Sequence, residues 1–531
     1  RGKMADLPYI MELIDFISSL SMNVLQLYME DKHRLSSYPE AGSLYGAYTE
    51  DEIRQIDEYA KARFIELQPN IQTFSHMHGI LRFPQFSHMS ENDTLFSFCA
   101  VDDDVLTFLD REFEEVLPWY SSKTLNINMD EAYDLGSGRS RQAVTQNGKA
   151  EVFFSYLDKV ISLARRHGAE KIQIWGDAVL KYPEYASQLP DYVTVIDWNY
   201  NPADSYDSIR SYPGVVKNYW AAPGVSSWNS IFPRVYNSMK NIRNYSRDAF
   251  DASAQGYLVT DWGDYGHYQM HGLSLFSYMY AAECAFNIHR KDDSTQFWIQ
   301  ACRYFFPDEH VSEAFRYLMD SNEAQNIHTG FKSMSIYAFF DDMFTGLSMR
   351  GNDKYPKVTP EAFRTLKDLG GKAYESLMKA GNSSSYWPLL TGQTFLDELR
   401  LAALMTEYTG DKGILSYRIT GEFENGTVNE EKLLGFIIDI KRLFRRFTDI
   451  MLEFVRLWRL RAKEDGMEAT LFIFEKAAVQ LSKAAVFLAR EREKLIAGLP
   501  VSMSDYHDGD DYEVLWTSDF RNMWDRAYPW Q

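Results

Sequence analysis

Two adjacent carboxylates, Asp130 and Glu131, close the apolar run TLNINMDE and give the sequence its sharpest chemical signal. Neighbouring carboxyl groups perturb each other's pKa, so one can stay protonated while the other stays charged. Cleavage of a glycosidic bond requires such a pair. Successive side chains of a strand face opposite ways, so both can enter one pocket only where the strand gives way to a loop. The pair stands at that place.

Three tryptophans, Trp175, Trp198 and Trp262, stand at or near the ends of other apolar runs. Aromatic faces stack on the C–H faces of sugar rings. The chain is 15% aromatic, with 12 Trp and 34 Tyr, which favours carbohydrate work, although a large aromatic core also explains that composition. We expect the three indoles to form a box around the carboxylates.

The elements that must position these residues alternate along the first half of the chain. Helical periodicity covers residues 7–20, 49–62, 101–117, 150–167, 233–249 and 273–285. Between them lie the short apolar runs MNVLQLYMED, FIELQPNIQTF, TLNINMDE, AEKIQIWGD, YVTVIDWNY, VVKNYWAAP and GYLVTDWGD. Alternating strands and helices predict a parallel α/β fold, either a barrel or a doubly wound sheet.

The ends of the apolar runs favour the barrel. Nearly every run ends in polar or aromatic residues: Glu30, Asp31, His76, Asp130, Glu131, Trp175, Asp177, Trp198, Trp220, Trp262 and Asp264. In a (β/α)8 TIM barrel these ends converge on one mouth, where the active site is built. No GxGxxG or Walker A sequence follows a strand, which removes the usual ligand of an open sheet. Since seven strands are counted and a barrel needs eight, we expect the first strand upstream of Arg1.

From about residue 296 amphipathic helical stretches replace the strands, so we predict a catalytic barrel over 1–295 and an all-α domain over 296–531. A long helical run is expected from Asn429 to about Leu488, and residues 331–360 hold the turn residues of a connecting loop. The acidic stretch SDYHDGDDYE lacks the ordered spacing of an EF-hand. We predict no metal and no cofactor.

Charge and composition exclude several classes of protein. The net charge is -20, with 75 acidic and 55 basic residues, which argues against nucleic-acid binding. No apolar run reaches the ~18 residues of a membrane span. Cys99, Cys284 and Cys302 are too few and scattered for a disulfide framework. No signal peptide is visible, and the bacterial cytoplasm is the favoured compartment.

The chain resembles glycoside hydrolase family 20, within it the bacterial enzymes with a helical C-terminal domain. The residues that carry the resemblance are NINMDEAYDLGSGR, QLYMED, IQTFSHM, IQIWGD, VIDWNY and VTDWGDYGHYQ. The resemblance covers about residues 1 to 290 and, more weakly, the helices. It implies an exo-acting, retaining β-N-acetylhexosaminidase that removes terminal β-linked GlcNAc or GalNAc from glycans and glycoconjugates. The substrate's own acetamido group would be the nucleophile, through an oxazolinium intermediate.

The resemblance also implies roles for single residues. Glu131 would be the general acid/base and Asp130 would orient the acetamido group, supported by His76 and Asp31 from neighbouring strands. The remaining candidates would bind the sugar: Trp175, Trp198 and Trp262 as the wall, Asp264 on the outer hydroxyls, Tyr200 or Tyr219 on the acetamido oxygen, and Trp228 at the outer rim.

Two departures from the family pattern stand out. The family's HxGGDE form is reduced to NINMDE, and its sugar-binding arginine belongs to the first strand, which Arg1 follows. Two other functions remain open: an O-GlcNAc hydrolase-type glycosidase, which would show two aspartates here, and a non-catalytic sugar-binding protein on a hydrolase scaffold. A homodimer is also left open.

Overall fold

Seven parallel strands form one curled sheet in sequential order, β1 to β7. The computed structural model describes residues 3–42, 46–264, 267–288, 296–297, 299–301, 308–324, 333–352, 356–380 and 392–506. The strands are β1 (Val24–Met29), β2 (Glu66–Ile71), β3 (Thr124–Asn126), β4 (Lys171–Trp175), β5 (Val193–Trp198), β6 (Asn218–Ala222) and β7 (Gly256–Tyr257). This curled parallel sheet confirms the predicted TIM-barrel class.

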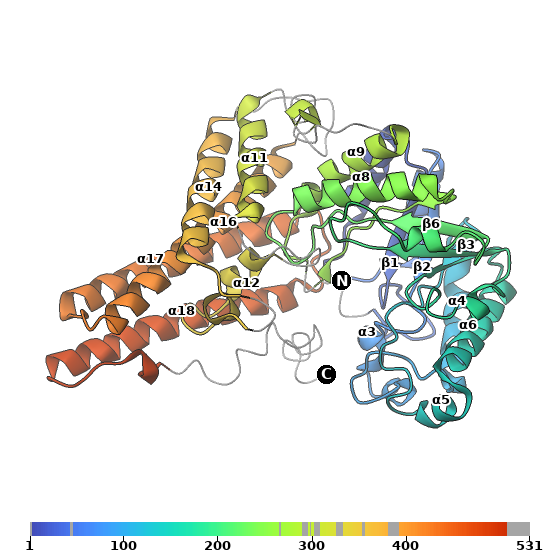
Figure 1. The fold of residues 1–531 in the computed structure, drawn as a ribbon, viewed down its shortest axis with the longest axis horizontal. Helices are drawn as coiled ribbons and strands as arrows, with labels where there is room; N and C mark the ends of the chain where they lie inside the picture. The colour runs from blue at the N-terminus through green and yellow to red at the C-terminus, as the bar shows by residue number, and fades with distance from the viewer. Residues whose placement is uncertain are drawn as a thin grey trace.

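A helix precedes or follows each strand on the outside of the sheet (Figure 1). The long ones are α1 (Leu7–Ser19), α2 (Glu50–Lys61), α4 (Asp103–Val116), α6 (Lys149–Arg166), α8 (Val235–Asp251) and α9 (Leu275–Phe286). Short helices α3 (His78–Leu81), α5 (Arg141–Asn147) and α7 (Pro183–Ala186) lie in the loops. Local sequence is enough to predict where α2 begins, because Thr49 and Glu52 form a reciprocal capping box there. All six predicted helices are confirmed.

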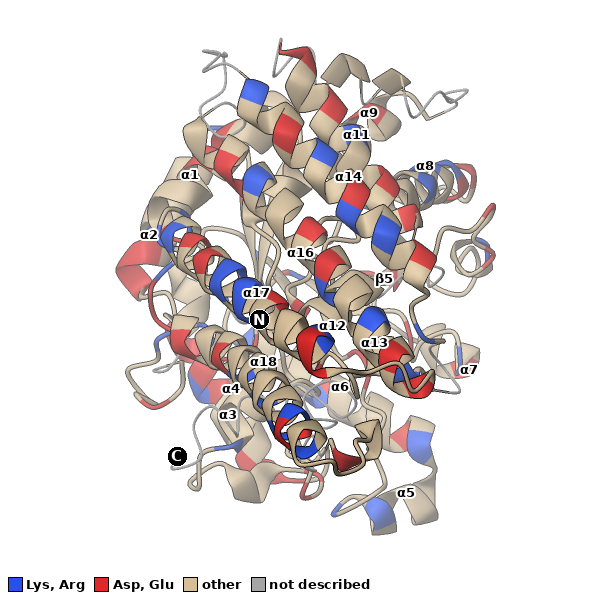
Figure 2. Ribbon diagram, turned by 90° about the vertical axis from the view of Figure 1, so that its left-hand side faces the viewer, with Lys and Arg blue, Asp and Glu red and all other residues tan. Residues whose placement is uncertain are grey.

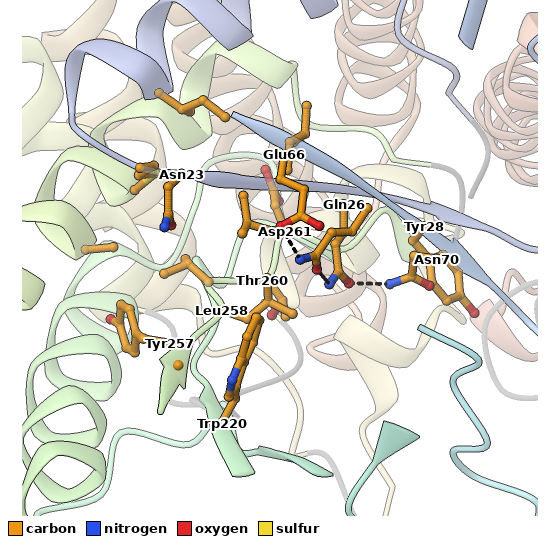
Figure 3. Close-up of a pocket in the computed structure, with 18 of the residues that line it drawn as sticks. Asn23, Gln26, Tyr28, Glu66, Asn70, Trp220, Tyr257, Leu258, Thr260 and Asp261 are labelled. Atoms are coloured by element: carbon orange, nitrogen blue, oxygen red, sulfur yellow. Dashed lines mark hydrogen bonds between the residues drawn. The ribbon is translucent and has the colours of Figure 1, made fainter. Parts of the chain in front are cut away.

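The sheet is open between its first and last strands. Among the described residues β1 and β7 each pair on one side only, and five of the six residues of β1 are half-buried, whereas five of the six in β2 are buried. A cavity of about 1610 Å³ fills the barrel interior and this opening, lined by both strands and by α1 and α9. Figure 3 shows the cavity with Gln26, Tyr28, Trp220 and Tyr257 around it. That a further strand fills the opening stays a prediction.

Two strands end earlier than the sequence predicts. β3 stops at Asn126 because Asn128 and Met129 have φ of 60° and 70°, a left-handed conformation that cannot continue a strand. β7 has only two residues, and it pairs on one side alone. The residues that follow, including Glu131 and Trp262, therefore lie in loops beyond the strand ends.

Helices make up the described part of the chain from residue 308 onward (Figure 1). They are α11 (Glu309–Glu323), α12 (Met334–Phe340), α13 (Leu347–Arg350), α14 (Pro360–Lys379), α16 (Gln393–Glu424), α17 (Glu430–Trp458) and α18 (Met467–Ile496). The single run predicted over 429–488 is wrong: it is two helices, because α17 ends at Trp458 and the chain turns over residues 459–466, where Gly466 has φ of 85°. The loop predicted over 331–360 contains α12 and α13.

A backbone hydrogen bond and an ion pair join these helices to the barrel. Arg461, which follows α17, is itself held by α16: its Nε donates to Glu398 Oε1 at 2.6 Å, and both side chains are buried. The Asp6 backbone N–H donates to Arg461 O at 3.0 Å, and Lys463 Nζ lies 2.8 Å from Glu52. The proposed domain boundary at 295/296 falls at the edge of residues 289–295, which lie outside the described residues. The part of the acidic stretch SDYHDGDDYE from residue 507 on also lies outside them.

Acidic and basic residues are intermixed along the C-terminal helices α14, α16, α17 and α18 (Figure 2). Many of these charges pair within one helix, as in Lys372–Asp368 and Arg364–Glu361. Within the described ranges, no helix has the length and apolar character that crossing a membrane demands.

Candidate active site

One imidazole bridges the two carboxylates. His76 Nε2 lies 3.2 Å from Asp130 Oδ2 and 3.3 Å from Glu131 Oε2. His76 follows β2, and the carboxylates follow β3, so neighbouring strand ends bring the three groups together as the sequence predicts. Because both carboxylates contact one ring nitrogen, they lie on the same wall of the site.

The backbone of this wall is held in unusual conformations. Asn128, Met129, Glu131 and His76 all have positive φ, between 51° and 70°. Such conformations cost free energy for residues with a Cβ and cluster at functional sites. The Glu131 backbone N–H donates to Asp177 Oδ2 at 2.9 Å, so a carboxylate from the end of β4 fixes the turn that presents Glu131.

Gln72 and Tyr28 complete the surroundings of Asp130, and the sequence did not single them out. Gln72 Nε2 donates to Asp130 Oδ1 at 2.8 Å and to the Tyr28 hydroxyl at 3.0 Å. Gln72 is fully buried just past the end of β2. The available signal was a polar residue in the apolar run FIELQPNIQTF, close to the end of its strand. Because Gln72 is uncharged, sequence reasoning did not select it as a candidate.

The carboxyl groups have shifted pKa values. Burial alone raises the pKa of Glu131, but the hydrogen bond and charge of His76, helped by the Tyr133 hydroxyl at 2.9 Å, outweigh it and hold this pKa below its usual range. Burial and the neighbouring Asp130 charge raise the pKa of Asp177 to about 6. The side chain of Tyr133 is mostly exposed to water, and its hydroxyl donates a hydrogen bond to the Glu131 carboxylate.

An aromatic wall stands beside the carboxylates. Trp175, Trp198 and Trp262 lie in one cluster with Trp220, Ile196 and Leu258. The Trp175 and Trp262 rings are 6.0 Å apart, and Tyr28 meets Trp262 edge-on at 4.9 Å. Trp262 Nε1 donates to the Tyr200 hydroxyl at 2.9 Å, and Tyr200 stacks on Trp198 at 5.3 Å. The structure thus brings together the three predicted tryptophans and Tyr200.

Two predicted residues lie elsewhere. Tyr219 faces away from the cavity on β6 because side chains alternate along a strand: its ring stacks on Tyr212 at 5.7 Å, and its hydroxyl donates to Ala252 O. Trp228 is not at the rim but buried behind Tyr200, with its ring 5.0 Å from the Tyr200 ring. Asp31 is buried and pairs with Lys32, and its support of the carboxylates stays a prediction.

Asp264 lies in the loop beyond β7, and its charge raises the pKa of Arg234. Sequence reasoning did not identify Arg234. Burial lowers the pKa of Arg234 to about 9, against the opposing effect of Asp264. Arg234 Nη1 donates to Trp228 O at 2.6 Å. This guanidinium therefore sits behind the aromatic wall, on the side of Asp264.

The bridged triad is also a group with the spacing of metal ligands. Ligand atoms of His76, Asp130 and Glu131 lie within 4.8 Å of one another, a distance that a cation could span. The interior cavity is lined by Trp175, Trp262 and Tyr28, but His76, Asp130 and Glu131 are not among its lining residues. The chemistry of the triad therefore lies at the mouth, above the cavity rather than inside it.

Comparison with known proteins agrees with this geometry. Residues 3–211 match the family described as glycosyl hydrolase family 20, catalytic domain. This region belongs to glycosyl hydrolase family 20. The family match covers the strands from β1 to β5 and, with them, His76, Asp130, Glu131 and Trp175.

Relatives of this family 20 region include hexosaminidase D from Homo sapiens, 26% identical over 303 residues, which are 51% of this chain and 60% of the human protein. Hexosaminidase D from Bos taurus is 24% identical over 295 residues, 51% of this chain and 84% of the bovine protein. The chain thus spans less than two thirds of the human relative. A solved β-N-acetylhexosaminidase from Bacteroides fragilis shares 17% identity over 56% of this chain and 67% of that one, with a TM-score of 0.46.

Proposed function

We propose that this protein is an exo-acting β-N-acetylhexosaminidase, which cleaves terminal β-linked N-acetylhexosamine from glycans with retention of configuration. The observation that carries the proposal is the bridged carboxylate pair at the barrel mouth, Asp130 and Glu131, beside the wall of Trp175, Trp198 and Trp262. Membership of family 20 and the hexosaminidase D relatives support it.

Glu131 is the proton donor in this proposal. Its carboxyl group protonates the leaving oxygen and then takes a proton from the attacking water. A proton donor needs a raised pKa, whereas His76 and Tyr133 hold the pKa of Glu131 low in the open site. A bound sugar would displace the exposed Tyr133 hydroxyl and exclude water, and both changes raise this pKa toward that of an acid.

Asp130 has the second role, which is to accept a hydrogen bond from the 2-acetamido N–H. The hydrogen bond from Gln72 and the 3.2 Å contact with His76 hold this carboxylate in place. A protein nucleophile would have to face the acid across the anomeric carbon, at a carboxyl separation of about 5–5.5 Å. Asp130 instead shares one wall and one imidazole with Glu131, so the acetamido oxygen is the nucleophile and forms an oxazolinium intermediate.

The test is turnover of chromogenic β-GlcNAc, β-GalNAc and β-glucose glycosides by the purified chain. We expect cleavage of the two N-acetyl sugars and hardly any of the glucoside. Binding of GlcNAc without turnover of any glycoside would instead make the protein a non-catalytic sugar binder. Equal cleavage of the glucoside would point to a two-carboxylate hydrolase.

A further inference from the structure

A row of amide side chains crosses the barrel interior and ends at the aromatic wall. Gln26, Asn70 and Gln173 line the interior cavity from β1, β2 and β4, and Asn128 lies in the loop just after β3. Figure 3 shows the hydrogen bond between the Gln26 and Asn70 amides, which belong to neighbouring strands. The last member, Asn128, is fully buried and has φ of 60°.

Asn128 is tied to Trp175 through both its backbone and its side chain. The Trp175 backbone N–H donates to Asn128 O at 2.9 Å, and the indole Nε1 donates to Asn128 Oδ1 at 2.7 Å. Asn128 Nδ2 in turn donates to Asn70 Oδ1 at 2.8 Å. Trp175 is 3% exposed, so its N–H has little access to water as a substitute acceptor.

The direction of the row follows from the indole. An indole N–H can only donate, so the atom of Asn128 that faces it must be the oxygen, and the Asn128 amide nitrogen must face Asn70. Asn70 Nδ2 then donates to Gln26 Oε1 at 2.9 Å, and Gln26 Nε2 donates to Gln173 Oε1 at 2.6 Å. Every amide in the row thus has one orientation, and the row ends at the indole N–H of Trp175.

We propose that Asn128 is a positioning residue that holds the Trp175 indole in the plane at which it forms one wall of the sugar pocket. This inference rests on the proposed function, since it assumes that Trp175 contacts the sugar. It also explains why an asparagine stands at a left-handed position: the side-chain bonds to Trp175 and Asn70 offset the backbone strain. Removing the acceptor would leave a buried N–H unpaired and free the ring to turn.

The chain offers a matched control for the test. Asn128→Gly removes the acceptor while suiting the positive φ. Met129→Gly suits the positive φ next door and also removes a buried side chain, but it leaves the acceptor for Trp175 in place. Asn128→Asp restores the oxygen acceptor for the indole in nearly the same shape, and its second oxygen, in place of the amide nitrogen, donates to Asn70 only when it carries a proton. The three variants separate the side-chain bond from the backbone conformation.

The first readout is the Nε1–H resonance of Trp175 in protein labelled with 15N-tryptophan, assigned with Trp175→Phe. We expect Asn128→Gly to move this resonance upfield and to speed its exchange with solvent, whereas Met129→Gly and Asn128→Asp leave it near the wild-type position. An unmoved resonance in Asn128→Gly, or an equal shift in Met129→Gly, overturns the proposal.

The second readout is the kinetics on the chromogenic β-GlcNAc glycoside. We expect Asn128→Gly to raise KM about 3- to 10-fold, the scale of one lost hydrogen bond, with a smaller change in kcat. Asn128→Asp should recover most of the loss. A KM equally high in Asn128→Asp, with the indole resonance retained, contradicts the positioning role. The resonance needs no substrate, so a wild-type protein without turnover would overturn the proposed function while the indole contact is still measured.

Discussion

Gln72 donates a 2.8 Å hydrogen bond to Asp130, from one strand end to the next. Since the same amide nitrogen also donates to Tyr28, this buried glutamine links the first three strands at the point where Asp130 must be held. The carboxylate is therefore oriented before any sugar arrives.

Replacing Gln72 by Met tests this link. The thioether keeps the length of the side chain but cannot donate, so we expect kcat/KM on β-GlcNAc glycosides to fall about tenfold to a hundredfold, as for a lost bond to a charged group. Gln72→Asn, which keeps an amide but shortens its reach, is the companion variant. Wild-type activity of Gln72→Met would show that the bond does not orient Asp130.

Replacing Glu131 by Gln should remove the proton donor. We expect a loss of roughly 10²–10⁴ in rate on natural glycosides, the usual range for general acid/base catalysis. An activated phenolic leaving group needs less protonation, so in the first step its loss should be smaller. An equal loss on both kinds of substrate, measured in single turnovers, would argue against this assignment.

The raised pKa of Asp177 predicts how stability depends on pH. Its folded pKa is about 6, above the unfolded value of about 3.9, so the folded state binds the proton more tightly. The resulting stability is present at low pH and is lost as pH rises through 6. Asp177→Asn, which keeps an oxygen acceptor for Glu131 N–H, should therefore raise the free energy of unfolding at pH 8 by on the order of 1–2 kcal/mol.

The control for this variant is its own pH profile. The gain from Asp177→Asn should shrink toward zero as the pH is lowered to 4, because the carboxyl group is then protonated in the folded wild-type protein. Urea unfolding at several pH values gives the comparison. A gain of the same size at every pH would mean that Asp177 is not the titrating group.

Replacing Trp262 by Ala should weaken sugar binding by about 1–3 kcal/mol, the scale of a lost aromatic contact. Trp262 is only partly buried, and its Nε1 donates to Tyr200, so the melting temperature should change little. Trp262→Phe keeps a ring but no donor, and should bind better than Trp262→Ala. A large drop in melting temperature would make Trp262 a core residue.

The fold could be predicted from the sequence because its signals are local. Alternating periodicity placed the strands and six helices, and strand ends in a parallel barrel converge, so His76, Asp130 and Trp175 could be brought to one mouth before any coordinates. The direction of a side chain beyond a strand end is set by residues distant in the sequence, so it could not be predicted in the same way. Tyr219 and Trp228 depend on packing across the fold.

The missed residues share a different cause. Gln72, Tyr28 and Asn128 are uncharged polar residues within apolar runs, and their role comes from partners on other strands. The left-handed turn after β3 was hidden as well, because Asn and Met stand there instead of glycine. Nothing in an isolated stretch of sequence marks such positions.

The central claim is that the substrate's acetamido oxygen is the nucleophile, and one series of substrates tests it directly. Fluorine on the acyl methyl withdraws electrons from this oxygen, so kcat/KM should be measured on aryl β-glycosides bearing N-acetyl, N-fluoroacetyl, N-difluoroacetyl and N-trifluoroacetyl groups. We predict a steep, stepwise fall along the series, with a 2-hydroxy glucoside hardly reacting. A flat series, or trapping of a 2-fluoro sugar on a protein carboxylate, would contradict the account.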